Sequence, residues 1–336
     1  FWNNTTKRLG IGTTTPGARL EVYDTLDNLI KLSRSGTASN YTFNLGTDGK
    51  LVLKDQAGNS RITLDPAGNV GIGTTTPNEQ LEITKNLRLP PTTGSTVGVI
   101  LSGAYPFIHN YGSNNFFAGV SAGNFTMTGT GNVGVGPSAL AHNTSSDYNT
   151  AIGSRALFFN TAGDGNSAIG ADALSSNTTG YYNTALGGSA GSFSQTGIGN
   201  VFLGYQAGQG TTIYTGANNN TIIGYMAGYK ITTNSSGNVF LGSQAGYNET
   251  GSNKLYIANS STNPPLIYGD FSTGKVGIGT TNPTEKLQVG GNIKLGGTEG
   301  DVKDVNAILG YNDLFLRSNA AENAPVYIAG SQLSFY

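Results

Sequence analysis

A nine-residue pattern occurs eight times in the middle of this chain, and it reads N-x-x-φ-G-x-x-A-(L/G), where φ is an apolar residue. The first five steps between copies are 17 residues long, and the last two are 20 and 18. A short fixed period is typical of a solenoid, because one repeat cannot bury its own apolar face and must stack on its neighbours. The longer steps predict loops at 210–219 and 230–236, with the stack continuing past them. The copies begin at Asn115, Asn132, Asn149, Asn166, Asn183, Asn200, Asn220 and Asn238.

Local patterns indicate that this solenoid is built from strands. No stretch sustains apolar residues at the i, i+3, i+4, i+7 spacing of a helix. Short alternating runs such as 41–45 and 61–64 are separated by turn tripeptides such as those at 47–49 and 66–68. We therefore expect an all-β chain, with a parallel β-solenoid (β-roll) of about eight 17-residue coils flanked by modules of short strands.

The overall composition excludes several classes of protein. The net charge is −1 at pH 7, which gives no electrostatic basis for binding nucleic acid or an anionic membrane. The 17 Tyr and 14 Phe argue against simple disorder, and the absence of Cys excludes disulfides and thiolate metal sites. No run of 18 apolar residues occurs, so we expect no membrane insertion in this chain.

A second repeat, G-I-G-T-T-x-P-x-x-x-L-x-(V/I), flanks the solenoid. Its Pro presets the backbone of a turn, so we expect one strand to end at the second Gly and the next to begin at the Leu. We divide the chain into N-terminal short-strand modules at 1–107, the solenoid at 108–253 and C-terminal modules at 254–336. The three copies of the second repeat occupy 10–22, 71–83 and 277–289.

Stacking would turn each position of the nine-residue pattern into a column along the solenoid axis, with a spacing of about 4.7–4.9 Å. We expect the apolar residue to point inward, the Ala to suit a tight interior, and the Gly to allow a bend or a close backbone approach. The Asn amides could hydrogen-bond to one another along the axis. Members of these columns are Asn149, Asn166, Ile152, Ile169, Leu186, Leu203, Gly153, Gly170, Ala156 and Ala173.

The coils carry more apolar side chains than one thin coil can enclose, for example at 157–159 and 181–182. A continuous exposed apolar stripe usually marks an interface. Cyclic symmetry is the common way to cover such a stripe with copies of one chain. We therefore expect a parallel homo-oligomer with its chains in register.

The segments 149–157 and 166–174 resemble head repeats of trimeric autotransporter adhesins of the YadA type. The segments 68–77 and 274–283 resemble modules of bacteriophage tail fibres and large bacterial surface proteins, and so does 252–271. The resemblance implies a left-handed β-roll, a homotrimer and an extracellular location. The family's repeat is shorter, so the extra residues at 142–148 are expected to form a longer loop.

Residues that could carry chemistry are few. Asp147 and Asp164 each precede a pattern Asn by two residues and should stack one coil apart, roughly 5 Å, which is also the carboxylate separation of retaining glycosidases. We favour two exposed loop acids, with a Ca²⁺ site and a catalytic pair as the alternatives. His109 and His142 lack metal-ligand partners at useful spacing and are interpreted as packing or loop residues. We expect no enzyme activity, no cofactor and no metal.

The expected function is that of a structural and adhesive segment of a homotrimeric extracellular fibre on a bacterial surface. Its partners would be other copies of the chain, and a cell-surface glycan or protein receptor. A bacteriophage tail fibre or similar host-recognition appendage is the first alternative. A polysaccharide-degrading tailspike is a less favoured second alternative.

Overall fold

The structure is a computed structural model that describes residues 2–3, 5, 7–11, 13–16, 18, 20–22, 28–33 and 40–291. These residues form 23 strands and no helix, so none of them belongs to a helix able to cross a membrane. The chain divides into two compact units, Phe1–Pro91 and Thr92–Tyr336. The expected C-terminal modules beyond residue 291 lie outside the described residues.

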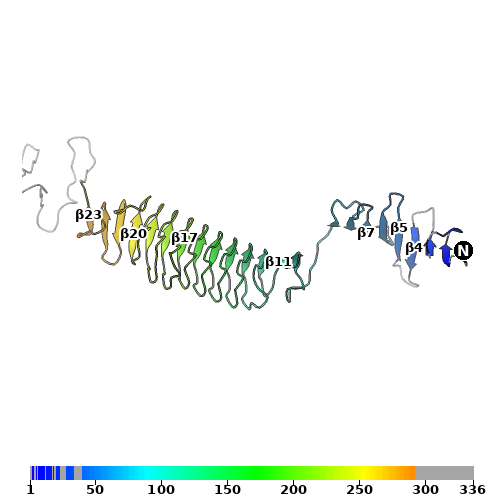
Figure 1. Ribbon diagram of the computed structural model, residues 1–336, viewed down its shortest axis with the longest axis horizontal. Helices are drawn as coiled ribbons and strands as arrows, with labels where there is room; N and C mark the ends of the chain where they lie inside the picture. Colours follow the sequence, from blue (N-terminus) through cyan, green and yellow to red (C-terminus); the bar gives the residue numbers. More distant parts are fainter. Residues whose placement is uncertain are drawn as a thin grey trace, which may run out of the picture. The chain divides into compact units, whose positions relative to one another are not determined.

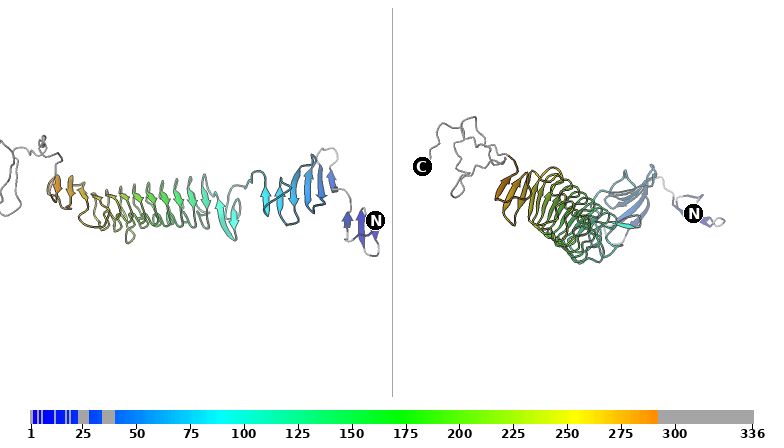
Figure 2. Two further views of the ribbon diagram at one scale, coloured as in Figure 1. Left: turned by 90° about the horizontal axis from the view of Figure 1, so that it is seen from above. Right: turned by 60° about the vertical axis from the view of Figure 1, so that its left-hand side comes forward.

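The second unit contains the predicted β-solenoid, and this prediction is confirmed. Nine strands pair in parallel, each with the next along the chain, and most are three residues long. Figures 1 and 2 show them side by side in one layer, with one coil of chain between consecutive arrows. They are β12 (Phe116–Ala118), β13 (Val133–Val135), β14 (Thr150–Ile152), β15 (Ser167–Ile169), β16 (Thr184–Leu186), β17 (Val201–Leu203), β18 (Thr221–Ile223), β19 (Val239–Leu241) and β20 (Lys254–Ile257).

The stack continues through the two longer steps, as expected. Leu203 pairs with Ile223, and Ile223 pairs with Leu241, so the register is kept. The first longer step adds an exposed stretch at 211–213, after which Tyr214 returns to the interior. Its hydroxyl donates a hydrogen bond to the Gly208 carbonyl at 2.5 Å, which fastens the enlarged coil to its own backbone. The insertion therefore changes the outline of one coil and not the stacking.

Antiparallel strands continue the same sheet at both ends of the parallel stack. The hairpin of β10 (Ile100–Ser102) and β11 (Tyr105–His109) pairs with β12. At the other end β20 pairs with β21 (Ile267–Asp270), which pairs with β22 (Lys275–Ile278). The sheet of this unit has 14 strands in total.

The G-I-G-T-T-x-P repeat forms a short parallel coil. In the repeat at 71–83, β8 (Val70–Ile72) pairs in parallel with β9 (Leu81–Ile83). A Cβ added at Gly71 would lie 2.7 Å from the Thr74 carbonyl oxygen, so the turn folds directly over the middle of the strand. The same close approach occurs in the copies at 10–22 and 277–289. The paired strands of those copies are β2 (Arg8–Ile11) with β3 (Leu20–Val22), and β22 with β23 (Leu287–Val289).

The first unit also contains a six-stranded sheet, in which antiparallel strands lead into the β8–β9 coil. One further strand of this unit, β1, pairs antiparallel with β2 and so completes a separate three-stranded sheet with β2 and β3. The remaining strands are β1 (Trp2–Asn3), β4 (Asn28–Ser33), β5 (Asn40–Leu45), β6 (Leu51–Asp55) and β7 (Ser60–Leu64).

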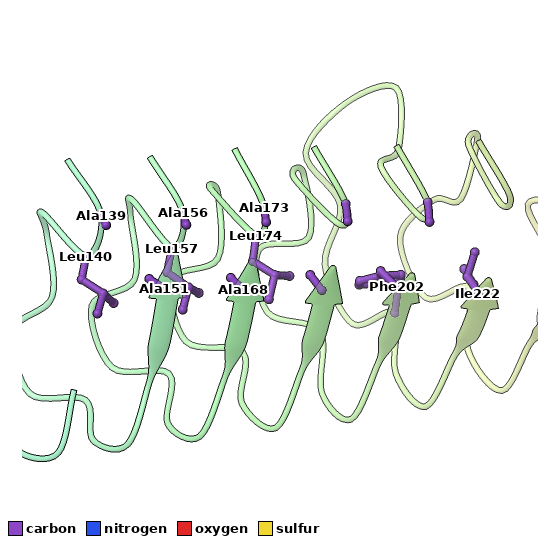
Figure 3. Packing of buried hydrophobic residues seen from close by; sticks show 14 of the residues in the cluster. Ala139, Leu140, Ala151, Ala156, Leu157, Ala168, Ala173, Leu174, Phe202 and Ile222 are labelled. Carbon is purple, nitrogen blue, oxygen red and sulfur yellow. The ribbon is translucent and has the colours of Figure 1, made fainter. Parts of the chain in front are cut away.

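The solenoid core is filled by two positions of each coil that share a small space. The middle residue of the strand points inward, and the residue six positions later lies against it. In the coils of β14 and β15 the strand residue is Ala and the later residue is Leu, as Figure 3 shows for Ala151 with Leu157 and Ala168 with Leu174. In the coil of β17 the sizes are exchanged, because a Cβ added at Gly208 would lie 2.2 Å from the Phe202 ring. In these coils one of the two positions holds the large side chain and the other holds a small residue.

This exchange predicts a compensating pair of substitutions. Ala168→Phe should destabilise the chain by overcrowding, by about 1–3 kcal/mol. Leu174→Gly should destabilise it by leaving a cavity, by about 2–5 kcal/mol. The double variant reproduces the Phe202–Gly208 arrangement, so it should melt at a higher temperature than either single variant. Thermal unfolding of all four proteins gives the coupling free energy, and simple additivity would contradict the shared-space account.

Candidate functional site

The outer face of the strands carries the apolar column that the sequence analysis placed inside, and that prediction is wrong. Ile152, Ile169, Leu186 and Leu203 are 40%, 41%, 45% and 37% exposed. The physical reason is the alternation of a strand. The pattern Asn is buried, so the residue two positions later is also inward, and the apolar residue one further on must point outward.

The outward apolar residues form one row across the whole 14-stranded sheet, which we call the aliphatic row. Strand pairing places one aliphatic residue of each strand opposite the next, through both parallel and antiparallel pairs. None of the residues in the row is buried. The row is Ile100, Ile108, Ala118, Val135, Ile152, Ile169, Leu186, Leu203, Ile223, Leu241, Ile257, Ile267, Ile278 and Val289.

The six-stranded sheet of the first unit has the same property. Phe43, Leu53, Ile62, Ile72 and Ile83 are paired in register from β5 to β9, and none is buried. The opposite face of that sheet holds its buried residues, which include Val52 and Thr63. The polarity expected of a sheet in a single chain is thus inverted, since its apolar side faces outward.

The pattern Asn residues form a buried column that bonds each coil to the next. The Oδ1 atom of Asn149 accepts a hydrogen bond from the backbone N–H of Asn166 at 2.9 Å. The Nδ2 atom of Asn166 donates to the Gly180 carbonyl of its own coil at 2.8 Å. The side-chain amide therefore pairs with a backbone N–H of the next coil and with a backbone carbonyl of its own coil. The contact from Oδ1 to the N–H of the next coil recurs from Asn115 to Lys254.

The pattern Gly and Ala residues lie where the coil turns after the strand. Gly153 and Gly170 have φ angles of 133° and 135°, which non-glycine residues rarely adopt. A Cβ added at Gly153 would lie 2.5 Å from the Gly170 carbonyl oxygen, so the backbones of neighbouring coils also approach closely here. Ala156 and Ala173 follow and are fully buried.

A second buried amide column lies on the side of the coil that was expected to be a longer loop. Within residues 142–148, Asn143 and Ser146 are buried in the coil, whereas His142 and Tyr148 are exposed. Asn177 donates through Nδ2 to Asn160 Oδ1 at 2.8 Å and to the Gly180 carbonyl at 2.9 Å. The signal was present in the sequence, since Asn recurs with the 17-residue period at positions 143, 160 and 177.

Asp147 and Asp164 have a defined structural role. Asp147 Oδ1 accepts the backbone N–H of Thr130 at 2.7 Å, and Asp164 Oδ1 accepts that of Asp147 at 2.8 Å. Asn218 does the same for Ile198 at 2.8 Å, so an uncharged side chain can take this position. Within the described ranges no group of three or more His, Asp or Glu residues could hold a metal ion.

His109 closes one end of the solenoid core, whereas His142 is exposed. The His109 ring lies 5.0 Å from the Phe117 ring and 4.5 Å from the Phe125 ring. Its Nε2 lies 2.8 Å from the Ala122 carbonyl, and its Nδ1 accepts the Tyr111 N–H at 3.4 Å. These partners fit the neutral tautomer with the proton on Nε2, and burial lowers the pKa of His109 below 6.5.

This environment predicts a loss of stability on mild acidification. Below about pH 6.5 the unfolded chain binds a proton at His109 that the folded chain resists, so the free energy of unfolding falls as pH falls. The melting temperature should therefore decrease between pH 7.5 and pH 5.5. His109→Gln should reduce this decrease, while His142→Gln should retain it. An unchanged pH profile in His109→Gln would exclude His109 as its source.

A side-chain network lies beside a surface hollow at the end of the parallel stack. A hollow of about 190 Å³ is lined by residues that include Tyr247, Glu249 and Tyr256. Tyr256 donates its hydroxyl to Glu249 Oε2 at 2.7 Å, and Glu249 Oε1 accepts the Gly251 N–H at 2.7 Å. Both carboxylate oxygens are thus used within the fold.

Comparison with known proteins found no matching family model, no matching curated protein and no matching solved structure.

Proposed function

We propose that this chain is a structural and adhesive segment of an extracellular homotrimeric fibre on a bacterial surface. The observation that carries the proposal is the aliphatic row from Ile100 to Val289, which one chain leaves uncovered. Removal of apolar area from water is favourable by about 25 cal/mol per Å², before the entropic costs of association, so a row of this length favours coverage by a partner. A partner with the same repeat would match it strand by strand.

The partner we infer is the chain itself, in register. The row advances by one strand spacing per coil, and a second copy of the chain carries the same spacing without adjustment. Cyclic symmetry lets each copy bury its row equally and leaves no copy with an open face. The number three rests on the resemblance of the repeats to trimeric adhesin heads. The uncovered apolar face of the first unit separately supports assembly with further copies.

A bacteriophage tail fibre or similar host-recognition appendage is the alternative. Both proposals use the same solenoid and the same row, and they differ in how the fibre is attached. A membrane anchor encoded in the same gene would favour the bacterial surface. A virion-attachment domain, or a gene set among virion genes, would favour the phage.

The proposed homotrimer predicts opposite outcomes for two neighbouring residues. Ile169 is on the aliphatic row, so Ile169→Asp should dissociate the oligomer while each chain keeps its β-structure, because the charge can reach water. Ala168 is fully buried, so Ala168→Asp should unfold its coil at a cost of several kcal/mol. Light scattering measures the oligomer, and circular dichroism measures the fold. A wild-type chain that stays monomeric at high concentration would exclude the proposal.

We further propose that the chain acts by contact and not by catalysis. Asp147 and Asp164 already accept backbone amides, and Asn218 shows that this role needs no charge. Asp147→Asn should therefore melt within a few degrees of the wild type. Purified protein should release no oligosaccharides from polysaccharides. Release that disappears in Asp147→Asn would instead favour the tailspike function.

A further inference from the structure

The two most exposed large hydrophobic side chains of the parallel coils are tyrosines at one corner of the solenoid. Tyr148 is 69% exposed and Tyr182 is 68% exposed. They occupy the same position of the coil, two coils apart, and the coil between them has Gly165 there. Two strand spacings separate equivalent atoms by roughly 9.5 Å along the axis.

Both rings are held in the same way. A Cβ added at Gly131 would lie 2.7 Å from Cδ1 of Tyr148, and one added at Gly165 would lie 2.8 Å from Cδ1 of Tyr182. Each ring thus leans with one edge on a glycine of the preceding coil. The backbone N–H of Tyr148 donates to the Thr130 carbonyl at 2.9 Å, which fixes the base of that side chain. The Tyr182 ring also meets the Tyr181 ring edge to face, with centroids 5.2 Å apart.

We propose that Tyr148 and Tyr182 are two stacking platforms for an extended, neutral, β-1,4-linked glycan; this inference rests on the adhesive function proposed above. Exposed aromatic rings that are held in place favour contact with the apolar C–H faces of pyranose rings. In a β-1,4-linked chain every second sugar turns the same face to one side. Its disaccharide repeat is close in length to two strand spacings, so one chain reaches both rings.

The acidic residues around the two tyrosines favour a neutral ligand over an anionic one. Asp147 directly precedes Tyr148, and Asp164 directly precedes Gly165, which has the same coil position between the two tyrosines. Their carboxylates would repel a uronic-acid chain and could accept hydrogen bonds from sugar hydroxyls. The small polar residues Thr150, Ser167 and Thr184 start the strands between this corner and the aliphatic row. Coverage of the row by other copies therefore does not require coverage of the tyrosines.

The test is calorimetric titration of the whole chain with cellohexaose and chitohexaose, with a galacturonic acid hexamer as the acidic probe. The neutral hexamers should bind, and the acidic hexamer should bind more weakly. Tyr148→Ala and Tyr182→Ala should each weaken binding at least tenfold, because each removes one of two linked contacts. Tyr148→Phe and Tyr182→Phe keep the ring and should bind nearly as well as the wild type.

Tyr105→Ala is the matched control, because Tyr105 is 61% exposed in the β10–β11 hairpin, away from this corner. It should bind like the wild type. The proposal is overturned if neither neutral hexamer binds, if the acidic hexamer binds best, or if both alanine variants at the site bind like the wild type. An equal loss in Tyr105→Ala would also overturn it. Light scattering of every variant separates the two proposals. A trimer that binds no glycan would keep the proposed fibre and exclude this glycan site. A monomer that binds glycan would keep the site and exclude the proposed homotrimer.

Discussion

The buried Asn column is the interaction on which the stack depends. A turn between two parallel coils leaves backbone groups that the short strands cannot pair, since most strands have only three residues. The carboxamide supplies an acceptor to the next coil and donors to its own coil, as for Asn149 with Asn166 and for Asn166 with Gly180. Leaving such a buried group unpaired costs about 1–3 kcal/mol, so the column repeats this gain at every level.

The same Asn column determines which side chains of each strand point outward, and therefore that the outer face of the sheet is apolar. Once Asn149 is inward, Ala151 is inward and Ile152 is outward, and the two facing core positions of each coil hold at most one large residue. Larger aliphatic side chains collect on the outer face, where they form the aliphatic row. The narrow coil and the uncovered apolar face therefore both follow from the alternation of inward and outward side chains along each strand. The uncovered face favours assembly with further copies.

The sequence was sufficient for the repeat, the strand positions, the parallel stacking and the continuation past the longer steps, because these depend on period and on local turn chemistry. The inward direction predicted for Ile152 and Ile169 is wrong, because the buried pattern Asn sets the alternation of the strand, and recurrence of an apolar residue does not by itself identify the core. The second amide column at Asn143 and Asn160 follows the 17-residue period, but the period alone does not show that these residues are buried. Asp147 was singled out for its spacing, but its partner, the Thr130 amide, depends on coil geometry that no pattern in the sequence displays.

The coil that starts at Asn183 joins two styles of packing. On one side the interior is filled by Leu174 and on the other by Phe202, whereas the two facing core positions of this coil hold Ala185 and Gly191. A Cβ added at Gly191 would lie 3.0 Å from Leu174 and 2.5 Å from Phe202, so side chains from both neighbours meet within it. This coil therefore connects a block of coils with a Leu-filled interior to a block that begins with the coil filled by Phe202. Whole coils could be added or removed within either block while this level stays unchanged, and the length of the solenoid can vary without a new core.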